Sequence, residues 1–165
     1  MFHGWKVVGV AFLVAVYGWG FGFYGVGVFV AALQERHGWS ASTVSAAVTL
    51  YYLLGGTLIL FAGGAFERLG PRRVVLTGML CMGAGAIGLT LAGAIWHVYA
   101  AFVFMAIGWA CTSGAALNLI VAPWFEKKRG QAVSLAFNGA SFGGIAVAPL
   151  LLFAIARLGF EWGVA

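Results

Sequence analysis

Long stretches without any charged residue are the feature of this sequence that most restricts its fold. The nine basic and four acidic residues gather in short clusters and leave uncharged runs at 7–34, 37–66, 74–125 and 130–156. A helix that crosses the hydrocarbon core of a bilayer needs roughly 20 apolar residues. Each run is long enough for at least one crossing, so the sequence predicts an integral membrane protein.

The third run, at 52 residues, is too long for a single crossing and is expected to hold two. Small and interfacial residues at 93–97 mark the break. Transmembrane β-strands would appear as segments of about ten residues with alternating polarity, whereas these runs are apolar on every face. We therefore predict an all-α membrane protein with five spans. They are expected near 6–33, 41–64, 73–93, 98–124 and 130–157.

Lysine and arginine are distributed unequally between the two ends of this predicted bundle. Arg36 and Arg157 lie at one end, and the other end holds the remaining seven: Lys6, Arg68, Arg72, Arg73, Lys127, Lys128 and Arg129. Because cytoplasmic loops are enriched in these residues, we expect a multi-pass protein of the cell membrane, of the bacterial inner-membrane type, with a cytoplasmic amino terminus. A sixth helix is expected to begin at about residue 160, in a chain that is incomplete.

The composition also bears on the classes of partner and ligand. Only 8% of the residues are charged, against about 25% in soluble proteins. The net charge of +5 arises from loop clusters, so we attribute it to topology and to contact with membrane lipids, and we expect no nucleic-acid partner. Cys81 and Cys111 fall in different spans and are interpreted as packing residues. We expect no metal site and no cofactor, because no spacing of ligand residues suggests one.

The connection between spans two and three carries the densest motif. It reads GGAFERLGPRR from Gly63 to Arg73. A glycine followed by proline breaks the backbone sharply, and Glu67 lies among three arginines, where we expect it to form an ion pair while it caps a helix end. The loop resembles the conserved cytoplasmic loop of the major facilitator superfamily. The matching positions are Gly63, Glu67, Arg68, Gly70 and Arg72.

Two further stretches resemble the monocarboxylate-transporter-like and oxalate/formate-antiporter-like members of that superfamily. One is WFEKKRGQA at 124–132, followed by Ala136 and Gly139, and the other is the opening pair Gly4 and Trp5. The resemblance implies two six-helix halves around a central cavity. Residues 1–165 would then form a partial N-terminal transmembrane half that contains its first five helices, and the missing C-terminal half would be its partner.

The resemblance also has departures. Glu67 stands where the family usually has Asp, and Pro71 where it has a basic residue. Tyr24 occupies the position of a substrate-linked lysine of the animal monocarboxylate carriers, so this half lacks that carboxylate-binding group. In the family the loop that begins at Gly63 helps to close the cytoplasmic side, and the resemblance implies the same gating role here.

Polar residues at helical spacing identify candidate substrate contacts, because polar groups in lipid tend to face the bundle interior. Span three offers no such stripe and is expected to pack outside the other four. Shared hydrogen bonds between helices are the alternative interpretation for all of these residues. The candidates are Tyr17, Tyr24, Tyr52, Asn118, Asn138 and Ser141.

The function implied is secondary active transport by alternating access. The cargo would be a small organic anion, such as a monocarboxylate or an oxalate-like acid, moved by proton symport or anion exchange. The alternative is a non-transporting membrane partner or regulatory subunit derived from a carrier half. A membrane enzyme is disfavoured, because the spans contain neither a carboxylate pair nor a metal-binding HExxH spacing.

Overall fold

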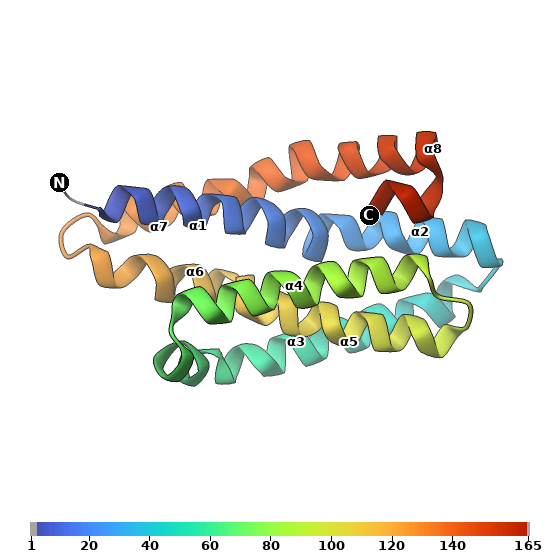
Figure 1. Cartoon of the computed structure of the whole chain (residues 1–165), viewed down its shortest axis with the longest axis horizontal. Coiled ribbons are helices and arrows are strands. Elements are labelled where there is room, and N and C mark those ends of the chain that lie inside the picture. The colour runs from blue at the N-terminus through green and yellow to red at the C-terminus, as the bar shows by residue number, and fades with distance from the viewer. Residues whose placement is uncertain (1–2, 165) are drawn as a thin grey trace.

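The computed structural model describes residues 3–164, and all of the regular elements in that range are helical (Figure 1). Five helical segments are long and apolar enough to cross a membrane, which confirms the predicted fold class. The first span comprises α1 (Gly4–Trp19), a π-helical turn η1 (Gly20–Tyr24) and α2 (Gly25–His37). The second and third are α3 (Ala41–Leu69) and α4 (Pro71–Thr90).

The fourth and fifth spans are both interrupted. The fourth comprises α5 (Ile95–Thr112), α6 (Gly114–Val121) and a short 3₁₀ turn η2 (Ala122–Trp124). The fifth comprises α7 (Arg129–Phe142), a second π-helical turn η3 (Gly143–Val147) and α8 (Ala148–Val164). Within α8 the chain reverses at Gly159, where φ is +81°, and the last residues run back toward α2 (Figure 1).

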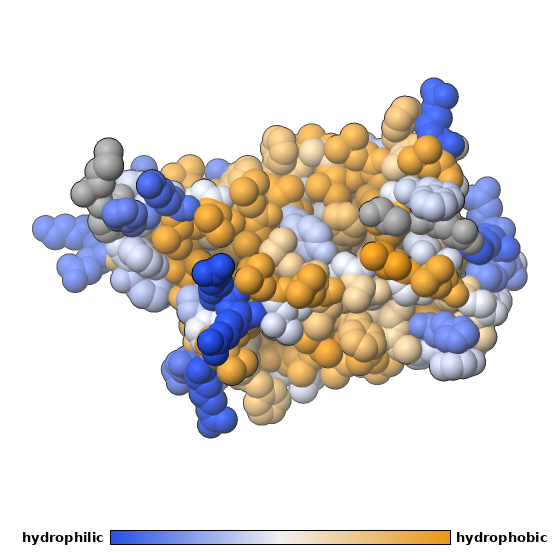
Figure 2. All heavy atoms as spheres, viewed as in Figure 1, coloured by the Kyte–Doolittle hydropathy of each residue, from blue (hydrophilic) through white to orange (hydrophobic). Residues whose placement is uncertain are grey.

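The surface is divided in the way a bilayer requires. Hydrophilic residues gather at the two ends of the molecule, and a hydrophobic band lies between them (Figure 2). The start of α1, the α3–α4 turn and the α6–α7 connection lie at the same end (Figure 1). The two basic loops therefore share one side of the bundle, as their alternation in the sequence predicts.

A single glycine forms the turn between α3 and α4. Gly70 separates Leu69 from Pro71 and has a φ of +79°, a conformation that costs a residue with a Cβ far more than it costs glycine. Proline at the first position of α4 needs no hydrogen-bond partner for its nitrogen. The glycine–proline pair of the motif therefore reverses the chain in one residue.

The fourth span lies at the centre of the packing. Both α3 and α4 lie along α5, and Phe102, Met105 and Leu117 of the fourth span are fully buried. Small residues allow the close approach: a Cβ added to Gly108 would lie 2.6 Å from the Cβ of Met82. The third span presents its opposite face outward, since Leu80 is 73% exposed.

The first and fifth spans form the other close pair, with α1 against α7 and the two π-helical turns facing each other. A Cβ added to Gly139 would collide with the carbonyl oxygen of Phe12, and one added to Gly143 would lie 2.6 Å from that of Val16. Backbone thus touches backbone along this contact. The Tyr51 hydroxyl donates a 2.5 Å hydrogen bond to the Gly22 carbonyl of η1, which ties the second span to the first.

Substitution of Gly139 tests the contact between the first and fifth spans. Gly139→Ala should lower the melting temperature in detergent, with a cost of about 1–3 kcal/mol, because the added methyl meets backbone that cannot move aside. Gly9→Ala on α1 is the control, since nothing lies within 4 Å of the position of its Cβ. Equal melting temperatures for the two variants would contradict the tight packing of α1 on α7.

Candidate functional site

Four spans bring aromatic side chains together near their middles. We call this group the aromatic platform. It comprises Trp19, Phe23 and Tyr24 of the first span, Tyr52 of the second, Trp109 of the fourth and Phe137 of the fifth. Trp109 lies halfway along its span, which runs from Ile95 to Trp124. The third span contributes no member.

The rings form one continuous chain of contacts. The Trp19 ring meets Trp109 edge-on, with centroids 5.1 Å apart, and meets Phe137 at 5.8 Å. Phe23 stacks on Trp109 at 6.3 Å with an interplanar angle of 25°. Phe23 also contacts Tyr24 at 5.2 Å and Tyr52 at 6.3 Å. These distances lie within the range in which aromatic pairs attract each other.

Glycines make room for these rings. A Cβ added to Gly55 would lie 2.9 Å from the Trp109 ring, and one added to Gly144 would lie 2.7 Å from the Tyr24 ring. A Cβ added to Gly114, the first residue of α6, would lie 2.6 Å from the Phe137 ring. Each ring therefore lies over backbone of a neighbouring span, and this contact sets its position.

The platform remains open on one side. Phe23, Tyr24 and Tyr52 expose 48%, 41% and 39% of their surfaces, while Trp19 and Trp109 are half-buried. Tryptophan is usually found at the ends of membrane spans, where its amphipathic ring meets the headgroups. Two tryptophans at mid-span, next to exposed tyrosines, are consistent with a surface that meets a ligand.

The tyrosine hydroxyls divide into two kinds. Tyr17 donates to the Met79 carbonyl at 3.0 Å and Tyr51 donates to the Gly22 carbonyl, so both tie spans together. Tyr24 and Tyr52 form no hydrogen bond within the described part of the chain. Their hydroxyls remain available to bind a polar group.

The structure brings only some of the candidate contacts together. Tyr24 and Tyr52 join the platform, whereas the Tyr17 hydroxyl donates to the carbonyl of Met79 on α4. Asn118 is half-buried and donates to the Gly114 carbonyl of its own helix at 3.1 Å. Asn138 and Ser141 are exposed on α7.

Asn118 also lines a surface pocket of about 540 Å³ near the basic end of the bundle. Arg129, the first residue of α7, lines the same pocket. The platform and this pocket are separate features.

Sequence reasoning missed Trp19, Phe23, Trp109 and Phe137, because it searched only for polar stripes. A signal was nevertheless present. Trp19 and Trp109 lie far from the ends of their charge-free runs, at a depth where tryptophan is uncommon in membrane spans.

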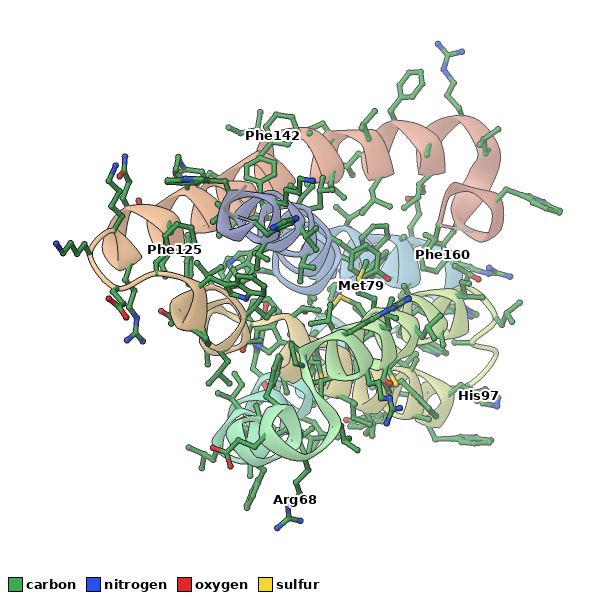
Figure 3. All side chains as sticks on the ribbon, turned by 60° about the vertical axis from the view of Figure 1, so that its left-hand side comes forward. Arg68, Met79, His97, Phe125, Phe142 and Phe160 are labelled. Atoms are coloured by element: carbon green, nitrogen blue, oxygen red, sulfur yellow. The ribbon has the colours of Figure 1, made fainter. Side chains whose placement is uncertain are left out.

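The segment from Gly63 to Arg72, here called the gate loop, differs from expectation at Glu67. Glu67, Arg68 and Arg72 are all exposed, Arg68 points away from the bundle (Figure 3), and within the described residues no ion pair joins Glu67 to a neighbouring arginine. Glu67 lies in the last turn of α3, where a negative charge opposes the helix dipole. The expectation that Glu67 forms an ion pair with a neighbouring arginine and caps a helix end is therefore wrong. Gly63 has open space beside it.

The residues that commonly bind metal ions are scattered in this structure. Within residues 3–164 no three His, Cys, Asp or Glu side chains lie together in a group that could hold a metal ion.

Comparison with known proteins places this architecture in a family. A family model described as Major Facilitator Superfamily matches residues 10–165. MFS-type transporter 1 of Ophiocordyceps sp. is 31% identical over 170 residues, which cover 99% of this chain and 36% of that protein. Monocarboxylate transporter 13 of Rattus norvegicus is 32% identical over 155 residues, covering 89% of this chain and 34% of the relative.

A third relative, the riboflavin transporter MCH5 of Saccharomyces cerevisiae, is 28% identical over 151 residues, with 84% of this chain and 28% of the relative covered. The chain thus spans about a third of the length of these proteins. No solved structure gives a significant match. Family match, helical spans and loop motif agree: this chain belongs to the Major Facilitator Superfamily of membrane transporters.

Proposed function

We propose that this chain forms part of a secondary active transporter for small organic anions, such as monocarboxylates or oxalate-like acids, which works by proton symport or anion exchange. The similarity to monocarboxylate transporter 13 along 89% of the chain is the observation that carries the proposal. The open aromatic platform supports it, because transporters of this kind hold substrate near the midplane.

In the proposed mechanism the platform receives the substrate between alternating conformations. Tyr24 and Tyr52 offer neutral hydroxyl donors to a carboxylate. The spans described here carry their charged residues only near their ends, so the counter-charge of the anion is supplied by a co-transported proton or by groups outside these residues. Substrate shifts the balance between conformations only through unequal affinity for them.

The loop from Gly63 to Arg72 is proposed to act as a cytoplasmic gate. Glu67 is exposed, lies unpaired at the carboxyl end of α3 and is disfavoured there by the helix dipole. Contact with a positively polarised group of another segment would relieve this cost in one transport state. Gly70 supports the gate by reversing the chain in a single residue.

We also propose that the basic end of the bundle faces the cytoplasm of a bacterial cell. The α3–α4 turn and the α6–α7 connection share that end (Figure 1), and positively charged loops are retained on the cytoplasmic side. The amino terminus would then be cytoplasmic as well.

Cysteine labelling tests this orientation. Single cysteines introduced as Arg72→Cys and Lys128→Cys, in a background with Cys81→Ala and Cys111→Ala, should react with a membrane-impermeant maleimide only after permeabilisation of intact cells. Trp96→Cys at the opposite end should react without it, because Trp96 is 66% exposed. Labelling of residues 72 and 128 in intact cells would reverse the assignment.

Uptake measurements test the class of cargo. Proteoliposomes that contain the carrier polypeptide bearing these residues should accumulate labelled lactate or oxalate in a saturable manner, driven by a proton gradient or by internal anion. Empty liposomes are the control. Without saturable uptake or exchange of any small carboxylate, the non-transporting partner becomes the better interpretation.

The gate is tested by Glu67→Gln, which keeps the shape of the side chain and removes its charge. Transport should fall about 5- to 30-fold, equivalent to a lost interaction of about 1–2 kcal/mol, while membrane insertion stays intact. Glu126→Gln is the matched control, since Glu126 is also exposed at the basic end. Equal transport by the two variants would exclude a gating role for Glu67.

A further inference from the structure

We propose that the aromatic platform makes this transporter selective for carboxylates that carry a flat aromatic ring, over aliphatic acids of the same charge. The inference deepens the proposed function and rests on it. It names the part of the substrate that the platform recognises, in addition to the carboxylate itself.

The exposed ring area is the first argument. Phe23 is 48% exposed and stacks on Trp109, whose inner side lies against the backbone at Gly55. A substrate of lactate size has almost no apolar surface with which to cover these rings. An aromatic substrate buries its own ring against them and gains from apolar contact and from favourable ring geometry.

The fixed position of the rings is the second argument. Trp109 is held between Trp19, Phe23 and the glycines at 22 and 55, so it forms a preorganised surface. Rigid aromatic side chains supply contact area with little loss of conformational freedom on binding. Ring preference therefore follows from groups that are already in place.

The third argument is the presence of polar donors beside the rings. Phe23 contacts both Tyr24 and Tyr52, and the hydroxyls of these two tyrosines form no hydrogen bond within residues 3–164. A ring that covers Phe23 would bring a carboxylate on its edge close to them. An aromatic monocarboxylate thus complements both the apolar and the polar parts of the site.

Transport selectivity tests this inference. The carrier polypeptide is reconstituted in proteoliposomes, and counterflow is measured with benzoate, cyclohexanecarboxylate and lactate. Cyclohexanecarboxylate has a similar size and the same charge but no flat ring. We expect kcat/KM for benzoate to exceed that for cyclohexanecarboxylate by about 3- to 10-fold, as expected for one added aromatic contact.

Variants assign the preference to the platform. Phe23→Leu should lower the ratio of kcat/KM for benzoate to that for cyclohexanecarboxylate to about one, whatever its effect on the transport of both acids. Tyr52→Leu provides a second test at a partly exposed position. Tyr24→Phe should lower the transport of all three carboxylates by the same factor and keep the preference for a ring. Tyr17→Phe is the control, because that hydroxyl ties α1 to α4 away from the platform.

The outcomes separate the two proposals. Equal transport of benzoate and cyclohexanecarboxylate, or a benzoate preference that survives both Phe23→Leu and Tyr52→Leu, would overturn the ring selectivity and leave anion transport standing. Failure to move any of the three acids would overturn the proposed function, and the selectivity with it.

Discussion

Close backbone contact through glycine is the interaction on which the rest of this structure depends. Lipid is as apolar as the helix surfaces, so membrane helices associate by van der Waals packing and hydrogen bonds, and small residues let them approach. Gly139 and Gly143 bring the fifth span onto the first, and Gly108 brings the fourth onto the third. These contacts fix the close spacing of the two pairs of spans.

The aromatic platform is a consequence of the same packing. Rings of Trp109, Tyr24 and Phe137 lie over Gly55, Gly144 and Gly114 of neighbouring spans. A larger residue at any of these glycines would displace a ring from the platform. Helix packing and the candidate binding surface therefore both depend on glycines, but on different ones.

The π-helical turn in the first span explains why helical spacing was an incomplete guide to the site. Tyr17 and Tyr24 are seven residues apart and would share a face of a regular α-helix. The π-helical turn at Gly20–Tyr24 adds residues to the turn, and each added residue rotates the following chain by about 100°. Tyr17 consequently binds the Met79 carbonyl, while Tyr24 joins the platform.

The sequence alone determined the class of the protein, the number of its spans and the placement of its basic loops at one end. These properties depend on the length of uncharged runs and on charge distribution, which are local. Tertiary structure decided which residues meet. The platform draws Trp19, Tyr52, Trp109 and Phe137 from four spans, and Glu67 proved to be unpaired among arginines close to it in sequence. Both results depend on side-chain direction and helix rotation, which are set by contacts between distant segments.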